Sequence, residues 1–238
     1  HIRNILKENK NISGISIGWA FHRKEISVKE VKDKIYSSNF PMRYPTKKSL
    51  PIKKKELKIS IVDYSMGNIR SLYNCLSKIN NNVIVTDDHD LLNSSDLIAL
   101  PGVGSFPEGM RNLEKRGLTK LIKRLANKNR AFIGICLGMQ LLFDESNEIQ
   151  NCEGLGIFEG KIKRLPVELS SNEAILLPHV GWNKVHLSNK YKEFFPDINE
   201  NFYQYFVHSY ANYTEILDNK NTFFSAYFGN QKFNAGVK

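Results

Sequence analysis

Residues 131–140 read AFIGICLGMQ, an apolar run that places Cys136 between Gly134 and Gly138. The pattern predicts a buried strand that turns sharply into a helix over residues 137–143, and G-x-C-x-G is the thiol counterpart of the nucleophile elbow of serine hydrolases. Such a turn puts the sulfur at a helix N-terminus, where backbone N–H groups favour a thiolate and a developing oxyanion. The alternative is a structural cysteine, because free cysteines are often buried.

A second apolar run upstream favours catalysis. Residues 97–100 read LIAL and pass directly into PGVGSF at 101–106. The first pattern predicts a buried strand, and the second predicts a glycine-rich turn whose backbone N–H groups can face a ligand. Alone, this turn would be an ordinary connection. About thirty residues before a cysteine elbow, in a strand–helix repeat typical of an α/β sheet, it is one half of an acyl-transfer site.

Five ordered blocks carry a resemblance to a known family. They are residues 58–72, 100–110, 134–143, 178–183 and 205–210. Together they resemble class I (triad) glutamine amidotransferases, and the P-H-x-G-W-N block resembles the glutaminase subunits of imidazole glycerol phosphate synthases. The resemblance implies an α/β, flavodoxin-like fold over residues 58–238, with a mostly parallel sheet and helices on both faces.

The resemblance also implies catalytic roles. Cys136 is similar to the nucleophile that attacks the side-chain amide of glutamine, forms a glutamyl thioester and releases ammonia. Val103 and Leu137 match the positions whose backbone N–H groups bind the oxyanion. Gly102 and Gly104 match the glycines that let that peptide reorient.

Four further positions match residues that bind glutamine. Gln140 follows the nucleophile by one helical turn, and Glu148 matches the carboxylate that pairs with the α-ammonium group. Ser209 and Tyr210 match backbone positions at the other end of the substrate. For Glu148 the sequence leaves a second reading open, that of a solvated acid in a polar loop.

Asn68, His179 and Trp182 match the face that related glutaminases turn toward the cyclase. The segment 178–183 reads PHVGWN, and its polarity predicts a loop with an exposed tryptophan. An exposed tryptophan is typical of an interface anchor. The alternative is that Trp182 packs into its own domain.

This sequence departs from the family pattern near residue 238. Family members activate the cysteine with a histidine and a glutamate in a G-x-Q-F-H-P-E segment, whereas residues 233–238 resemble the strand that precedes it. We therefore expect the domain at 58–238 to need that segment and to be inactive without it. His208 matches a histidine on a different strand, so we expect a structural or interface role for it.

The first forty residues resemble the C-terminal end of a cyclase TIM barrel. Residues 12–22 predict a strand and residues 26–35 a helix. Gly18 and Trp19 would then offer backbone N–H groups to a substrate phosphate. With a linker at 41–57, the chain is predicted to be an internal segment of a cyclase–glutaminase fusion or of two adjacent genes.

Composition excludes several other classes. The 238 residues are 41% hydrophobic and 24% charged, and three cysteines make a disulfide framework improbable. No apolar run reaches the ~20 residues of a membrane span, and no metal-ligand spacing or cofactor motif is present. Residues 1–57 hold 14 of the 34 basic and 5 of the 24 acidic residues. Without a nucleic-acid motif, we interpret this excess as a solvated helix face and linker.

The sequence leaves three functions open. The first is a cytoplasmic enzyme that hydrolyses glutamine and supplies ammonia to a cyclase, which makes imidazole glycerol phosphate and an aminoimidazole carboxamide ribotide in histidine biosynthesis. The second is a paralogue that supplies ammonia to a sugar amidotransferase for surface polysaccharides. The third is a non-catalytic docking module. The intact elbow and glycine-rich turn favour an enzyme.

Overall fold

The computed structural model describes most of the chain beyond residue 56. The described residues are 57–128, 130–169, 174–195, 198, 202–213 and 221–238, with Glu30, Val31 and Asp33. These last three are helical, in agreement with the helix predicted over 26–35. The predicted phosphate site at Gly18 and Trp19, the rest of the barrel remnant and nearly all of the linker lie outside the described residues.

Two compact units divide the chain. The elbow unit holds residues 50–164 and 210–215, and the hairpin unit holds residues 1–49, 165–209 and 216–238. Among the described residues, no helix is long and apolar enough to cross a membrane.

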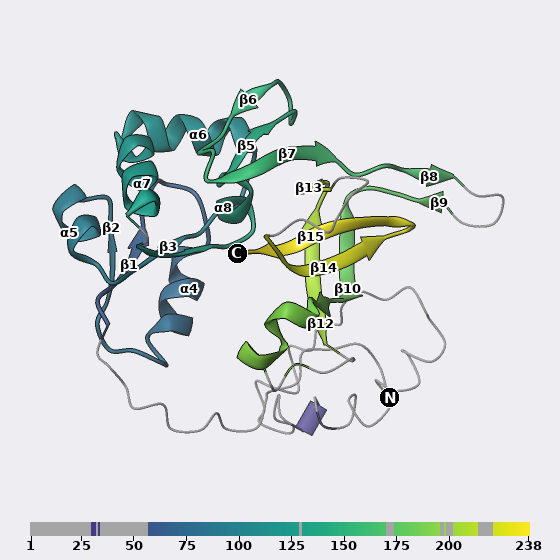
Figure 1. Cartoon of the computed structure of the whole chain (residues 1–238), viewed down its shortest axis with the longest axis horizontal. Helices are drawn as coiled ribbons and strands as arrows, with labels where there is room; N and C mark the ends of the chain where they lie inside the picture. Colours follow the sequence, from purple (N-terminus) through teal and green to yellow (C-terminus); the bar gives the residue numbers. More distant parts are fainter. Residues whose placement is uncertain are drawn as a thin grey trace, which may run out of the picture. The chain divides into compact units, whose positions relative to one another are not determined.

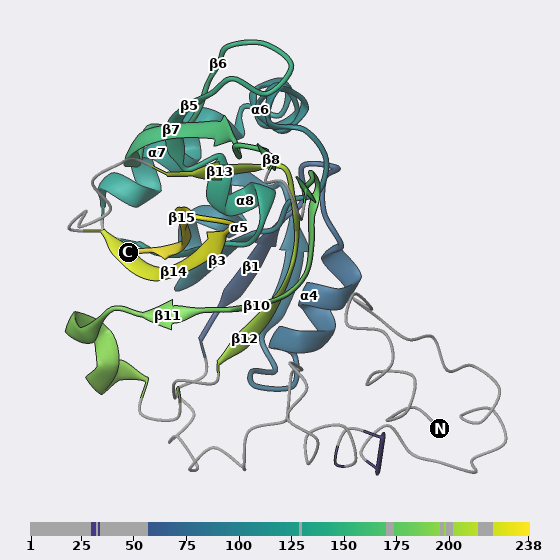
Figure 2. The same ribbon diagram turned by 90° about the vertical axis from the view of Figure 1, so that its right-hand side faces the viewer.

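The elbow unit is built on a parallel sheet. Its strands are β1 (Ile59–Val62), β2 (Val83–Thr86), β3 (Leu97–Leu100) and β4 (Ala131–Gly134), in the order β2-β1-β3-β4. Its helices are α4 (Ile69–Leu76), α5 (His89–Ser94), α6 (Phe106–Lys115), α7 (Leu118–Asn127) and α8 (Leu137–Gln140). Figures 1 and 2 show α4 on one side of this sheet and α7 on the other.

Hydrophobic pattern explains this layering. Strand β1 is buried at every position, as a parallel strand covered on both faces must be. Helix α7 buries Leu118, Leu121, Ile122 and Leu125, which share one face at a spacing of three and four residues. The predicted α/β class and parallel sheet are therefore confirmed.

A second sheet continues the elbow unit. It consists of β5 (Phe143–Ser146), β6 (Cys152–Glu153), β7 (Phe158–Arg164) and β13 (Tyr210–Asn212), in the order β13-β7-β5-β6. Two expectations need correction. The helix predicted to reach Phe143 ends at Gln140, because Phe143 already pairs with Phe158 in the sheet. Strand β4, predicted to be buried, has only exposed and half-buried residues, because it is the last of the four described parallel strands.

The hairpin unit contains antiparallel strands. Its elements are β8 (Glu168–Leu169), β9 (Ala174–Ile175), β10 (His179–Lys184), β11 (His186–Leu187), the 3-10 helix η1 (Asn189–Phe194), β12 (Tyr203–His208), β14 (Thr222–Phe228) and β15 (Gln231–Val237). Strand β10 pairs with β12, and β11, β14 and β15 form a three-stranded sheet. The loop predicted at 178–183 is wrong, because His179 to Lys184 form β10. Strand β10 pairs with β12 along its whole length, so backbone N–H and C=O groups of β10 have partners in a distant segment that the polar composition of 178–183 does not reveal.

Candidate active site

Cys136 lies at the turn between β4 and α8. Its backbone has φ 56° and ψ −120°, a region that side-chain-bearing residues rarely adopt. The helix that follows is held to this turn by the backbone N–H of Gln140, which donates to the Cys136 carbonyl at 3.1 Å. The structure therefore places Cys136 at the carboxyl edge of the parallel sheet, where open α/β sheets bind ligands.

The flanking glycines allow very close packing. A Cβ atom on Gly138 would lie 1.9 Å from the carbonyl oxygen of Leu100 at the end of β3, and one on Gly134 would lie 2.7 Å from Met139 Cα. Only hydrogen atoms fit in these spaces. The elbow is thus pressed against the end of β3.

The glycine-rich turn packs on the elbow. A Cβ atom on Gly102 would lie 2.5 Å from the backbone nitrogen of Gly138 and 2.7 Å from Leu137 Cβ. Gly104 has φ 106°, and the side chain of Val103 between the two glycines is 54% exposed. The two halves of the predicted acyl-transfer site, some thirty residues apart in sequence, are therefore in contact.

Electrostatics determines the state of the Cys136 thiol. The residue is exposed, yet its packing partly desolvates the sulfur and raises the pKa of the thiol. A hydrogen bond from the backbone N–H of Leu137 opposes this pKa shift. Desolvation is the larger effect, so the group is a neutral thiol at neutral pH and needs a base to become a nucleophile.

Gln140 and Tyr210 are brought together. The Gln140 side-chain nitrogen donates to the backbone carbonyl of Tyr210 at 2.9 Å, which joins α8 to β13 across 70 residues of sequence. Ser209 belongs to the hairpin unit, where its carbonyl accepts from the backbone N–H of Leu165 at 2.9 Å.

Glu148 is half-buried and bonded at the start of α6. One of its carboxylate oxygens accepts from the backbone N–H of Phe106 at 2.7 Å, and Phe106 is the first residue of that helix. A carboxylate at this position satisfies a backbone N–H that has no partner within the helix. Glu148 is therefore fixed beside the end of the glycine-rich turn rather than left as a solvated acid.

Tyr64 is a site residue that the sequence analysis did not find. It is fully buried, and its hydroxyl donates to the carbonyl oxygen of Pro101 at 2.6 Å. Burial, and secondarily the charge of Cys136, raises the pKa of this hydroxyl well above its usual range. The sequence signal that could have identified Tyr64 is its position two residues after β1, which places it at the carboxyl edge of the sheet.

The residues predicted to face the cyclase have different surroundings. Asn68 is exposed in the elbow unit, and its side chain caps α4 by accepting from the backbone N–H of Ser71 at 3.2 Å. His179, in the hairpin unit, is only 8% exposed. Its Nδ1 lies 2.9 Å from Nε2 of His208, and burial, followed by the charge of His208, lowers the pKa of His179 to about 4.

Trp182 lies on the other face of β10. It is half-buried and pairs with Tyr205 of β12, with the two rings edge to face at 5.6 Å between centroids. The neighbouring cross-strand pair, Val180 and Val207, is 43% and 60% exposed. This face of the two-stranded sheet therefore presents a continuous apolar surface within the hairpin unit.

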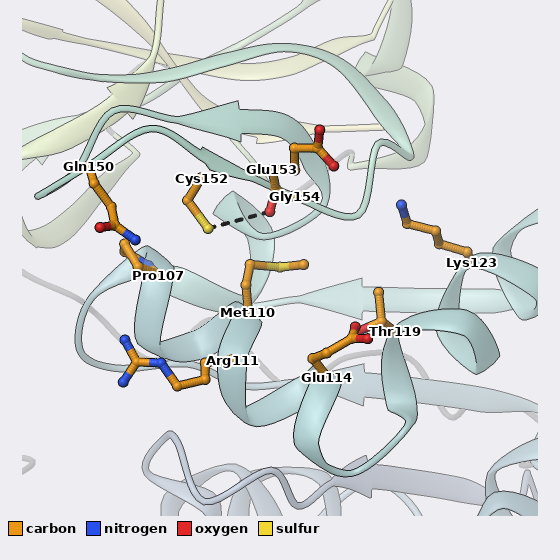
Figure 3. A pocket seen from close by; sticks show the side chains of 10 residues that line it. All are labelled: Pro107, Met110, Arg111, Glu114, Thr119, Lys123, Gln150, Cys152, Glu153 and Gly154. Atoms are coloured by element: carbon orange, nitrogen blue, oxygen red, sulfur yellow. Dashed lines mark hydrogen bonds between the residues drawn. The ribbon is translucent and has the colours of Figure 1, made fainter.

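A separate hollow lies elsewhere in the elbow unit. It is lined by side chains from α6, from α7 and from around β6, which Figure 3 shows. Its volume is about 400 Å³. Its walls carry charges of both signs, including Arg111, Glu114 and Lys123. None of the predicted site residues lines it. Among the described residues, no group of three or more His, Cys, Asp or Glu side chains could hold a metal ion.

Comparison with known proteins agrees with this geometry. The family described as "Glutamine amidotransferase class-I" matches residues 60–235. A solved structure titled "Crystal structure of glutamine amidotransferase" shares the fold, with a TM-score of 0.52 at 12% identity, and the match covers 72% of this chain and 85% of that one. The chain belongs to the class I glutamine amidotransferase family.

Its curated relatives narrow the assignment. The protein named "Imidazole glycerol phosphate synthase subunit HisH" from Sulfurimonas denitrificans is 40% identical over 152 residues, which cover 64% of this chain and 72% of that protein. The protein of the same name from Bacillus cereus (strain G9842) is 42% identical over 154 residues, covering 64% of this chain and 69% of the relative. Within its family the chain is HisH-like.

Proposed function

We propose that this chain hydrolyses the side-chain amide of glutamine to glutamate and ammonia, as the glutaminase of an imidazole glycerol phosphate synthase in histidine biosynthesis. The observation that carries the proposal is the contact between the cysteine elbow and the glycine-rich turn. A Cβ on Gly102 would meet the Gly138 nitrogen at 2.5 Å, so the glycine-rich turn lies against the start of α8, directly after Cys136. A structural cysteine would not require this arrangement.

The proposed chemistry is acyl transfer through a thioester. The Cys136 sulfur attacks the amide carbon, and the carbonyl oxygen becomes an oxyanion that accepts from the backbone N–H groups of Leu137 and Val103. The thiol proton passes through a base to the leaving nitrogen, ammonia departs, and water then hydrolyses the glutamyl thioester and restores the thiol. The raised pKa of Cys136 makes this base necessary. The family resemblance assigns the base to a histidine paired with a glutamate.

Glutamine binding is assigned to Gln140, Glu148, Ser209 and Tyr210. Two of these assignments have support from contacts within the elbow unit. The hydrogen bond from Gln140 to the Tyr210 carbonyl holds the Gln140 side-chain amide in one orientation, one helical turn after Cys136. The bond between Glu148 and Phe106 holds an anionic carboxylate where an α-ammonium group can pair with it.

A cyclase is the proposed partner, and it receives the ammonia to form imidazole glycerol phosphate and an aminoimidazole carboxamide ribotide. Trp182, Tyr205, Val180 and Val207 offer it an apolar face, which soluble domains usually cover with a partner. His179 is buried, so its contribution is to hold β10 against β12 beneath this face. Asn68 contributes from the elbow unit.

The test compares two nitrogen sources in the protein at its natural full length, with its cyclase. Cys136→Ala should abolish glutamine-dependent turnover and leave ammonium-dependent turnover unchanged, because only ammonia release needs the thiol. Cys75→Ala, which alters an exposed cysteine of the same unit, is the matched control and should change neither.

Other outcomes discriminate against the proposal. Glutamine-dependent turnover that survives Cys136→Ala would mean that another group is the nucleophile. A wild-type protein that binds the cyclase and hydrolyses no glutamine would be a docking module. A glutaminase that stimulates no formation of imidazole glycerol phosphate would belong instead to the sugar-amidotransferase class.

A further inference from the structure

The glycine-rich turn is tied at both of its ends by side chains from other parts of the elbow unit. At one end, the Tyr64 hydroxyl donates to the Pro101 carbonyl at 2.6 Å. At the other end, the Glu148 carboxylate accepts from the Phe106 N–H at 2.7 Å. Between these bonds lies Val103, whose side chain is 54% exposed. The turn therefore has two anchored ends and an exposed middle.

Tyr64 is enclosed so that its hydroxyl has little freedom to move. It is 0% exposed, and a Cβ on Gly102 would lie 2.8 Å from the hydroxyl oxygen. The loop that follows Tyr64 also packs on the turn, since a Cβ on Gly67 would lie 3.0 Å from Pro101 Cβ. A buried donor in such a site holds its acceptor in one orientation, because the carbonyl has no water to replace the bond.

The bonded carbonyl is next to the peptide that the proposed chemistry uses. Pro101 C=O belongs to the peptide between residues 101 and 102, and the Val103 N–H belongs to the following peptide. The two share only the Gly102 Cα, whose φ and ψ are the remaining freedoms. When the first peptide is fixed, only rotation about the Gly102 φ and ψ angles can change the direction of the Val103 N–H.

We propose that Tyr64 is a positioning residue of the glutaminase, which holds the Pro101 peptide so that the Val103 N–H faces the oxyanion formed at Cys136. This inference rests on the proposed function. Tyr64 acts through the turn, and the hydroxyl itself neither touches the substrate nor transfers a proton.

Tyr64→Phe removes the hydroxyl and keeps the ring that fills the core. Removal of one oxyanion donor costs about 10²–10³ in rate, and loss of its positioning should cost part of that. In the protein at its natural full length, with its cyclase, we expect kcat for glutamine hydrolysis to fall about tenfold with KM changed less than twofold, because the hydroxyl does not contact glutamine. Tyr213→Phe is the matched control, since Tyr213 also donates to a backbone carbonyl, that of Arg164 at 2.8 Å.

A second measurement separates an effect on the turn from an effect on the thiol. Alkylation of Cys136 by iodoacetamide is a direct displacement at carbon and forms no oxyanion. Its rate and pH profile, followed on the Cys136 peptide by mass spectrometry, should be the same in Tyr64→Phe and wild type. The folded fraction of each variant is measured separately by near-UV circular dichroism, so kcat can be expressed per folded molecule even when part of the variant misfolds.

The outcomes are distinct. Wild-type kcat in Tyr64→Phe, with an active wild type, would overturn the inference and leave the proposed function intact. A parallel fall of kcat and of the alkylation rate would assign Tyr64 to the thiol and also overturn it. An equal loss of kcat in Tyr213→Phe would attribute the effect of Tyr64→Phe to a general loss of stability and would also overturn the inference. A wild-type protein that is inactive at its natural full length and with its cyclase would overturn the proposed function itself.

Discussion

Gly138→Ala should damage the stability and the activity of the elbow unit together. The new Cβ would lie 1.9 Å from the Leu100 carbonyl oxygen, 2.8 Å from the Leu100 carbonyl carbon and 3.0 Å from the Pro101 carbonyl oxygen. Ordinary contacts of a Cβ begin near 3.4 Å. Strand β3 and the elbow must therefore separate by more than about 1 Å, in a core packed as densely as a crystal.

The magnitude follows from what has to move. Overpacking costs about 1–3 kcal/mol when side chains can adjust. Here the obstacle is backbone, and the same Leu100 carbonyl accepts from the Ile135 N–H at 3.0 Å, so the strain also reaches a hydrogen bond. We expect a loss of about 3 kcal/mol in the free energy of unfolding, or about 6–12 °C in Tm for a chain of this size.

The assay pairs urea or thermal denaturation with glutaminase kcat, and Gly109→Ala is the control. Gly109 is a buried glycine of α6, but its Cβ would meet the ends of the Leu141 side chain at 3.1 and 3.2 Å, which can rotate away. Alanine also gains about 1 kcal/mol of helix propensity there. The control should stay within about 1 kcal/mol of wild type. A Gly138→Ala variant as stable and as active as this control would refute the packing argument.

Three further predictions concern the partner face, a buried histidine and the nucleophile. Trp182→Ala should uncouple glutaminase activity from cyclase ligand without a loss of Tm; a large loss of Tm with coupling unchanged would mean that Trp182 is part of the core. His179 has its pKa lowered to about 4, so the unfolded state binds more protons between about pH 6.5 and 4, and the free energy of unfolding should fall by up to about 3 kcal/mol as the pH drops through this window. His179→Gln should flatten that dependence, and an unchanged slope would contradict it. The raised pKa of Cys136 means that its alkylation rate should still be rising above about pH 8.5, the pKa of an ordinary cysteine, and a plateau below that pH would exclude the desolvated thiol.

Local pattern predicted the parts of the fold that depend on local physics. The run LIAL at 97–100 coincides with β3, because a short apolar segment between turn residues is typical of a parallel strand that is covered on both faces. The two glycines around Cys136 likewise predicted the elbow. Their absent side chains are a direct requirement of the close approach to Leu100 and Met139.

Pairing between strands that are distant in sequence was harder to predict. The segment from His179 to Lys184 is too polar to predict a strand, yet it forms one, since Tyr203 to His208 supply its hydrogen-bond partners. Its buried histidine is tolerated because a second imidazole lies 2.9 Å away and aromatic rings surround it. Neither partner is visible within the segment itself.

For the site residues, too, the sequence predicted the side chains better than it predicted their partners. Motif position pointed to Gln140 and Glu148, but their partners are the Tyr210 carbonyl, 70 residues away, and the Phe106 N–H, 42 residues away. Tyr64 was missed, and its partner is again a backbone group. Every residue except proline carries the same N–H, and every residue carries the same C=O, so side-chain identity at the partner position gives no signal of the bond. A motif can thus name the polar side chain at a site, whereas only the fold determines which backbone group it binds and which peptide it holds in place.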